Sequence, residues 1–278
     1  MTESFRSPLH AEANAGLCAL VTGGGSGIGR ATAIELARSG AAVAVCGRRE
    51  EALAQTQSLI EAAGGRCLRL PGDVREHDDV VRIVDATLER FGAIDVLVNN
   101  AGGQFTSPAE EITDGGWKAV ERLAVDATWS VTRTVATRSM IPSGTGGLIV
   151  FIGFSPVRGI PGFVHASASR AAVSNLASGL ALEWSRYGIR SVCVAPGSIQ
   201  TEGLDGYDPA DVERWRRSVP LGRLGSAEEV ASVIAFLATA GGAYITGTTI
   251  VVDGGADAWG LAEPPPDAPR ARRAQETE

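Results

Sequence analysis

The stretch VTGGGSGIGR, residues 21–30, decides how the rest of the sequence is interpreted. It follows an apolar run at 17–22 and opens a helix-like segment at 27–39. Its glycines have the spacing G-x-x-x-G-x-G, which lets backbone N–H groups approach a pyrophosphate at the positive end of a helix. An ordinary tight turn is the alternative. The position between a strand and a helix favours a dinucleotide site, formed by Gly23, Gly25, Ser26, Gly27, Ile28 and Gly29.

Short apolar runs alternate with longer helix-like segments on both sides of this loop. Strands are expected at residues 17–22, 41–46, 66–70, 94–98, 147–152, 189–195 and 248–252. Helices are expected at 27–39, 49–63, 75–91, about 114–141, 164–187 and 226–240. Most strand segments are continuous apolar runs, as is typical of strands covered on both faces. The alternation predicts an α/β protein with a Rossmann-type doubly wound parallel sheet of about seven strands.

The two ends of the chain differ in composition from the segment between them. Residues 1–15 are polar, and residues 261–278 are rich in proline and charge. Both stretches have too few apolar groups to order themselves, so we expect disordered tails. No internal repeat or linker interrupts residues 16–260, which we interpret as one domain.

Composition narrows the function classes. The apolar fraction of 44% is ordinary for a globular protein, and the net charge of −7 argues against nucleic acid as a partner. No apolar run approaches about 18 residues, which argues against a membrane span. Four scattered cysteines without C-x-x-C spacing indicate reduced thiols rather than disulfides or a metal site. A soluble, cytoplasmic protein that binds a small molecule is expected.

The end of the second predicted strand bears on the choice of cofactor. NAD-binding sheets usually carry a carboxylate there for the ribose 2′-hydroxyl. This chain instead has Gly47, followed by Arg48 and Arg49, whose guanidinium groups suit a 2′-phosphate. The alternative is that both arginines are solvated charges at a helix start. NADP(H) is therefore the predicted cofactor.

Two further segments extend the predicted cofactor site. Asp73 and Val74, after the third strand, are placed to meet an adenine edge, although Asp73 could equally cap the next turn. The segment NNAGGQF, residues 99–105, follows the fourth strand. Within it Asn100 joins the predicted site, and Ala101 and Gly102 leave space for a ribose against the backbone.

Taken together, these motifs resemble the short-chain dehydrogenase/reductase family. TGGGSGIG, GDV, NNAG, APGSIQT (195–201) and ITG…VDGG (245–255) match its landmarks in order, over about residues 16–256. Within the family, NNAGGQFTSPAEEI…GW and VHASASRAAVSNL…LALEW are most similar to the trans-2-enoyl-CoA and 2,4-dienoyl-CoA reductases. The resemblance implies that residues 202–225 form a substrate lid and that the chain forms a homotetramer or dimer. It also implies a nicotinamide-side lining made by Pro196, Gly197, Ile199 and Thr201.

The same resemblance shows which proton-relay residues this chain lacks. The family uses an Asn, a Ser and a Tyr-x-x-x-Lys pair. Spacing puts Ala124 at the Asn position, Gly153 or Phe154 at the Ser position, Ala166 at the Tyr position and Arg170 at the Lys position. Ordinary ketone reduction needs the tyrosine hydroxyl as its acid. Reduction of a conjugated C=C tolerates the loss of that tyrosine.

Four residues remain as catalytic candidates. Arg170 could hold the nicotinamide ribose hydroxyls, or form a structural salt bridge. His165 could transfer a proton or bind a thioester carbonyl, although a lone histidine at a helix start is more often a cap or a buried structural residue. Ser155 could orient a carbonyl or a water, or simply belong to a turn. Tyr207, in the predicted lid, could fold over a substrate.

Substrate contacts are predicted on both sides of the site. Gln104 and Phe154 follow the fourth and fifth strands, and Trp215 lies in the lid segment VERWRR, residues 212–217. Arginines and an aromatic ring suit the phosphates and adenine of coenzyme A, although such a charge run is more often a solvated helix face.

Three functions follow from the sequence. The first is an NADP(H)-dependent reductase of a conjugated C=C in an enoyl thioester or a similar hydrophobic substrate. The second is an atypical carbonyl reductase or alcohol dehydrogenase with a relocated proton donor. The third is a non-redox relative, such as a cyclase, an isomerase or a binding protein, because fold alone does not fix function.

Overall fold

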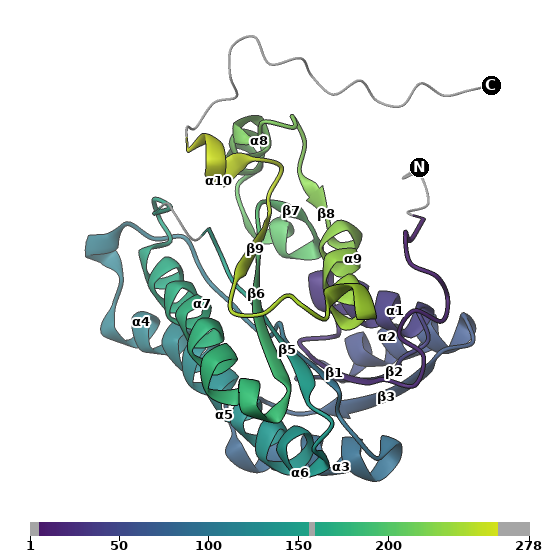
Figure 1. The fold of residues 1–278 in the computed structure, drawn as a ribbon. Helices are drawn as coiled ribbons and strands as arrows, with labels where there is room; N and C mark the ends of the chain where they lie inside the picture. The colour runs from purple at the N-terminus through teal and green to yellow at the C-terminus, as the bar shows by residue number, and fades with distance from the viewer. Residues whose placement is uncertain (1–5, 156–158, 261–278) are drawn as a thin grey trace, which may run out of the picture.

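The computed structural model describes residues 6–155 and 159–260. They form one seven-stranded parallel sheet with the strand order β3-β2-β1-β4-β5-β6-β9 (Figure 1). Its strands are β1 (Cys18–Thr22), β2 (Ala42–Gly47), β3 (Arg66–Pro71), β4 (Val96–Asn99), β5 (Gly147–Ile152), β6 (Ile189–Pro196) and β9 (Thr249–Val252). The predicted doubly wound parallel sheet is confirmed.

Helices cover both faces of the sheet, as Figure 1 shows. One face is covered by α1 (Gly27–Arg38), α2 (Glu50–Ala62) and α9 (Ala227–Ala238). The other is covered by α3 (His77–Phe91), α5 (Ala127–Val135) and α7 (Val164–Trp184), with the short turn η4 (Ser185–Tyr187) following α7. The central strands are buried because both of their faces pack against these helices, which is why they read as unbroken apolar runs.

The predicted helix at about 114–141 is continuous but not uniform. It begins with α4 (Asp114–Glu121), and α5 follows after a π-helical turn, η2 (Arg122–Asp126). A second π turn, η3 (Ala136–Met140), leads into α6 (Ile141–Ser143). A π turn inserts one residue and redirects the side chains after it, and such turns are frequent at functional sites. Ala124 lies inside the first of them.

The strand order places a crevice at the centre of the sheet. The chain runs outward from β1 to β3 and then returns to β4 on the other side of β1. Val21 of β1 pairs with Val98 of β4, so the two strands end at the same edge. In open α/β sheets, ligands bind outside the carboxyl ends of strands at such a reversal. The glycine loop and the NNAGG segment meet there.

The N-terminal segment corrects the expectation for residues 6–15. Asn14 is 1% exposed, and its side-chain amide donates to Ser39 Oγ and to the carbonyl oxygen of Ala235. Leu9 packs against the hydrophobic core cluster to which α1 and α9 contribute. A few apolar and amide contacts therefore order a stretch whose composition suggested disorder. Residues 1–5 and the predicted tail at 261–278 lie outside the described residues.

The predicted lid contains regular structure. A two-stranded pairing of β7 (Ile199–Gln200) with β8 (Gly225–Ser226) closes its base. Between them lie η5 (Glu202–Gly206) and α8 (Pro209–Ser218), and α8 is at the top of Figure 1 near α10 (Ala256–Trp259). The remaining short turns are η1 (Ala109–Glu111) and η6 (Ala240–Gly242). Within the described part of the chain, no helix has both the length and the apolar character needed to cross a membrane.

Candidate active site

The glycine loop joins β1 to α1 in a conformation that other residues would not permit. Gly23 and Gly27 have φ angles of +65° and +50°, which favour glycine. A β-carbon on Gly29 would lie 2.3 Å from the carbonyl oxygen of Gly23. Gly25 faces α2, where its β-carbon would lie 3.1 Å from that of Ala52. The loop therefore turns tightly at the start of α1.

A carboxylate occupies the N-terminus of α1. The backbone N–H of Gly27 donates to Glu202 Oε2 at 3.1 Å, and Arg30 Nη1 donates to Glu202 Oε1, also at 3.1 Å. The pKa of Glu202 is lowered first by its own backbone N–H, then by the Gly27 N–H and by the positive charges of Arg30 and Arg49, while burial opposes this shift. The loop thus holds an anion through the donors that a dinucleotide pyrophosphate needs. A dinucleotide fits this loop.

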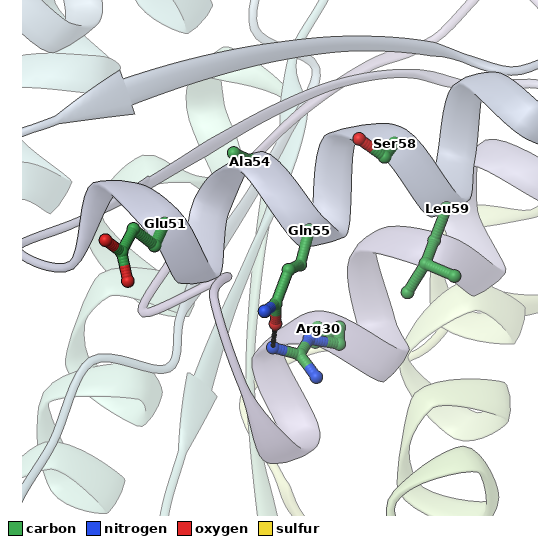
Figure 2. A pocket seen from close by; sticks show the side chains of 6 residues that line it. All are labelled: Arg30, Glu51, Ala54, Gln55, Ser58 and Leu59. Atoms are coloured by element: carbon green, nitrogen blue, oxygen red, sulfur yellow. Dashed lines mark hydrogen bonds between the residues drawn. The ribbon is translucent and has the colours of Figure 1, made fainter.

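Arg30 is positioned by contacts on both sides of the loop. Its guanidinium donates to the carbonyl oxygen of Gly25 at 2.5 Å and to Gln55 Oε1 at 3.2 Å. Figure 2 shows the Arg30 side chain meeting Gln55 at a pocket lined by residues of α1 and α2. Arg30 therefore connects the glycine loop to α2 through these two hydrogen bonds.

The segment after β4 is tied to the end of β1. The Asn100 side-chain amide donates to the carbonyl oxygens of Thr22 and Gly23, at 2.9 and 3.3 Å. The backbone N–H of Ala101 donates to Thr22 Oγ1 at 2.9 Å. Asn100 thus fixes the start of the glycine loop through its side-chain amide. The predicted cofactor segments at residues 21–30 and 99–105 are brought together.

The residues predicted for the adenosine end have local partners. Arg49 Nη2 donates to Ser26 Oγ at 3.0 Å. Arg48 is exposed, and its positive charge contributes to lowering the pKa of the Asp73 carboxyl. The main cause of that lowered pKa is the Arg75 guanidinium, and Asp73 Oδ1 also accepts from the Arg75 backbone N–H. Asp73 thus caps the following turn, as the alternative interpretation held. Val74 is buried beside it, and an adenine contact stays a prediction.

Arg170 reaches from α7 to the end of the crevice. Its Nη1 donates to the carbonyl oxygen of Ile152 at 2.6 Å, at the end of β5. A β-carbon on Gly102 would lie 2.0 Å from Nη2, so the guanidinium lies directly against the Gly102 backbone. Burial lowers the pKa of Arg170, and among the described residues no carboxylate pairs with it. Its other N–H donors can bind an oxygen-rich ligand.

The other three predicted relay positions carry no polar side chain. Ala124 and Ala166 are each 1% exposed. Gly153 is one of the two residues predicted at the serine position, and a β-carbon there would lie 2.4 Å from Cys193 Sγ and 3.3 Å from Ser174 Oγ. Cys193 thus takes the space that a larger residue at 153 would need. These positions supply no side-chain acid.

His165 lies apart from Arg170. Its ring stacks on Phe105, with centroids 4.2 Å apart and planes at 28°. At about 100° per residue, the two side chains leave α7 roughly 140° apart. His165 is 1% exposed, and neither ring nitrogen has a hydrogen-bond partner of ordinary geometry in the described structure. Burial lowers the pKa of His165, opposed by the Phe105 backbone, so the ring is neutral near pH 7.

The remaining candidates near β5 take different partners. The Ser155 hydroxyl donates to Asp257 of α10, which connects this segment to the C-terminal helix. Phe154 meets Phe163 edge-on, with ring centroids 6.4 Å apart. Gln104 is exposed in the loop after β4. Substrate contacts by Gln104 and Phe154 stay predictions.

Aromatic rings attach the lid to the start of α7. Tyr207 and Trp215 meet at 5.1 Å, and each lies 6.1 Å from Phe163, which directly precedes α7. Phe163 is buried, whereas α8 contains no fully buried residue. We call Phe163, Tyr207 and Trp215 the lid cluster. It connects α8 to the start of α7.

The lid arginines are largely occupied by neighbours on their own helix. Arg214 pairs with Asp211 at 2.7 Å, and Arg216 pairs with Glu213 at 2.5 Å, both at i,i+3 spacing. Such exposed pairs are typical of a solvated helix face. A solvated helix face was the alternative interpretation of residues 212–217, and a coenzyme A contact by this segment stays a prediction.

The segment after β6 reaches the glycine loop. A β-carbon on Gly197 would lie 2.6 Å from that of Asp253, so the turn after Pro196 packs tightly on the end of β9. Ile199 begins β7, and Thr201 lies against Gly27, its Cγ2 3.4 Å from where a β-carbon there would be. Glu202 therefore enters the anion position directly from this segment.

Comparison with known proteins agrees with this geometry. A family model described as Enoyl-(Acyl carrier protein) reductase matches residues 23–257. The chain belongs to the short-chain dehydrogenase/reductase family of oxidoreductases. It is 38% identical over 241 residues to a probable 2,4-dienoyl-CoA reductase of Bacillus subtilis, covering 85% of this chain and 94% of that protein. It is also 38% identical over 249 residues to a glucose 1-dehydrogenase of Gluconobacter oxydans, covering 88% and 94%.

A solved structure supports the same assignment. The citronellol catabolism dehydrogenase AtuB of Pseudomonas aeruginosa matches with a TM-score of 0.81 and 39% identity, over 91% of this chain and all of that one. Members of this family use a nicotinamide cofactor, and the residues around the crevice fit one.

Three residues of the site were not predicted from the sequence. Glu202 and Arg30 flank predicted cofactor segments, so proximity to Thr201 and Gly29 was the only available signal. Cys193 was predicted only as a buried thiol inside a strand, and burial does raise its pKa. Within the described ranges, no cluster of three or more His, Cys, Asp or Glu side chains is arranged to hold a metal.

Proposed function

We propose that the protein is an NADP(H)-dependent reductase of a conjugated C=C bond in an enoyl or dienoyl thioester. The observation that carries this proposal is the replacement of the relay tyrosine by buried Ala166, beside a retained cation at Arg170. Carbonyl reduction needs an acid at that position, whereas reduction of a conjugated C=C bond does not. Similarity to a dienoyl-CoA reductase supports the same substrate class.

Several segments would hold the cofactor. The glycine loop with the Gly27 N–H would bind the pyrophosphate, Arg48 and Arg49 the 2′-phosphate, and Arg170 the nicotinamide ribose. NADPH bound there supplies the hydride. The free N–H donors of Arg170 orient hydroxyl oxygens, and the Gly102 backbone allows the guanidinium its close approach.

The chain's own residues also limit where a proton can come from. Arg170 stays protonated at neutral pH even with its lowered pKa, so it binds oxygen atoms but does not act as the acid. The His165 ring is turned toward Phe105. We therefore propose that water protonates the product carbon, and that the lid cluster controls the access of water to the site.

A panel of substrates tests this function. Purified protein is mixed with NADPH or NADH and with 2-enoyl-CoA, 2,4-dienoyl-CoA, ketone or sugar substrates, and loss of reduced-nicotinamide absorbance is followed. We expect turnover with NADPH and an unsaturated thioester. Nucleotide binding by calorimetry without hydride transfer to any acyl-CoA would overturn the proposal and favour a non-redox role.

Carbonyl reduction is the second candidate, because a glucose 1-dehydrogenase is equally similar in sequence. In that case Tyr207 of the lid cluster is the candidate phenol, because its ring contacts Phe163 at the start of α7. Turnover of ketones or sugars that is abolished by Tyr207→Phe would establish this alternative. Unchanged carbonyl turnover in Tyr207→Phe would remove Tyr207 from that role.

Assembly and location form a further part of the proposal. Large apolar side chains are exposed on the outer helices and near the edge strand β9, including Leu182 at 81% and Trp129 at 41%. Exposed apolar groups of this size support a homotetramer or dimer, to be measured by light scattering. All four cysteines are unpaired, which supports a cytoplasmic location.

A further inference from the structure

The N-terminus of α1 is contacted by a residue that lies 175 positions further along the chain. Glu202 is the first residue of the lid, and its carboxylate bonds the Gly27 N–H and pairs with Arg30, each at 3.1 Å. The Glu202 side chain is 57% exposed, so it is not fixed by burial. Its position is instead determined by the helix N-terminus and one guanidinium.

That position is the one a pyrophosphate would take. The first N–H groups of a helix that follows a glycine loop are the usual donors to a phosphate. Gly27 has one N–H, and its hydrogen bond to a carboxylate is not available to a phosphate at the same time. A second anion placed there would also meet the repulsion of Glu202. The two occupants therefore exclude one another.

The contact with Gly27 is linked to the lid through a short segment. Four residues lie between Glu202 and Tyr207, whose ring belongs to the lid cluster on Phe163. Thr201, on the other side of Glu202, lies against Gly27. The lid is therefore attached at two points, one on the glycine loop and one at the start of α7. Displacing Glu202 from the glycine loop therefore changes how freely Tyr207 can move on Phe163.

We propose that Glu202 is a built-in competitor of the cofactor pyrophosphate. In the ligand-free protein its carboxylate occupies the Gly27 N–H, and binding of a dinucleotide displaces it together with the first turn of the lid. Cofactor binding and lid position are thereby coupled. The inference rests on the proposed dinucleotide site and adds a regulatory contact to it. Apparent affinity is reduced by the fraction of molecules in which the site is blocked.

Calorimetry with matched variants tests the competition. NADPH and NADP+ are titrated into the wild-type protein, Glu202→Gln and Asp205→Asn. Asp205 is the control because it is an exposed carboxylate of the same turn, η5, with no contact to Gly27. We expect Glu202→Gln to bind about three- to tenfold more tightly than wild type, and Asp205→Asn to match wild type. Equal or weaker binding by Glu202→Gln would overturn the inference.

Hydrogen exchange provides a readout that does not depend on turnover. In ligand-free wild-type protein the Gly27 amide should be protected, and Glu202→Gln should reduce that protection. Addition of NADP+ should restore protection at Gly27 and increase exchange around residues 202–207. Protection at Gly27 that is identical in the ligand-free variant would also count against the inference. Failure of every protein to bind nucleotide would instead overturn the proposed function, and the exchange data without ligand would still test the contact.

Discussion

The guanidinium of Arg170 lies against the backbone of Gly102, so closely that a β-carbon there would lie 2.0 Å from Nη2. The contact joins α7 to the segment after β4, and Arg170 Nη1 also donates to the carbonyl oxygen of Ile152 at the end of β5. Arg170 is a partly buried cation that donates to one backbone carbonyl oxygen, and its other N–H groups can bind a ligand. The first prediction follows from this contact.

Gly102→Ala should displace Arg170 and weaken cofactor binding. The added β-carbon would lie where the end of the flexible Arg170 side chain now lies, so we expect the guanidinium to move, the free energy of unfolding to change little, and the Kd for NADPH to rise. Gly103→Ala is the matched control, because a β-carbon at Gly103 meets only Leu123 Cδ2 at 3.5 Å. Chemical denaturation and calorimetry measure both effects. Equal behaviour of the two variants would show that the Arg170 contact is not restrictive.

Gly153→Ser should not restore a relay serine in this chain. Its β-carbon would lie 2.4 Å from Cys193 Sγ, so we expect a destabilisation of about 1–3 kcal/mol. Gly153→Ser combined with Cys193→Ala should lose less stability than the sum of the two single changes, because each relieves the other. Urea unfolding of all three variants measures this coupling. Additive losses would contradict the steric account.

His165 should make stability depend on pH near neutrality. Burial lowers the folded-state pKa of His165, so the unfolded chain binds its proton at a higher pH than the folded chain. Stability is then lost as pH falls through the unfolded-state pKa of about 6.5, with a slope of at most about 1.4 kcal/mol per pH unit from one group. The free energy of unfolding, measured by urea titration from about pH 7.5 to about pH 5.5, should therefore fall.

Two variants isolate this effect. His165→Leu removes the titrating ring and its unpaired nitrogen atoms, and should flatten the pH dependence over that range. His77→Gln, at the exposed start of α3, is the control for the loss of one histidine. A slope that persists in His165→Leu would assign the pH dependence to other groups.

Trp215→Ala should loosen the lid. Aromatic pairs contribute about 0.5–1.5 kcal/mol each, and Trp215 contacts both Tyr207 and Phe163. We expect trypsin to cleave at Arg214, Arg216 or Arg217 about tenfold faster than in wild type. Trp129→Ala, on α5 outside the lid, is the matched control. Unchanged cleavage would mean that contacts other than the lid cluster hold α8.

Much of the fold could be predicted because its signals are local. The strand β5 was predicted with its observed bounds, Gly147–Ile152, since its apolar run is framed by glycines. The end of α3 was also predicted, because Gly92 adopts the left-handed conformation that commonly ends a helix. The two π turns around α5 carry no comparable signal, since the helical periodicity continues through them.

The order of residues 6–15 shows a different limit. Composition predicted a tail, but Asn14 bonds Ala235 from 221 positions away. A polar residue whose hydrogen-bond partner is a distant carbonyl oxygen cannot be distinguished in the sequence from an exposed polar residue. Only the packing of α9 beside α1 provides that partner.

The sequence by itself determined the doubly wound sheet and the glycine loop, because periodicity and spacing act between near neighbours. It also predicted that the relay positions are held by Ala124 and Ala166. The tertiary structure decided which groups meet. It turned His165 toward Phe105, put Cys193 behind Gly153, and brought Glu202 onto Gly27 from 175 positions away. These contacts depend on how β-strands and helices pack in three dimensions, since residues distant in the chain become neighbours only when the sheet and its helices assemble.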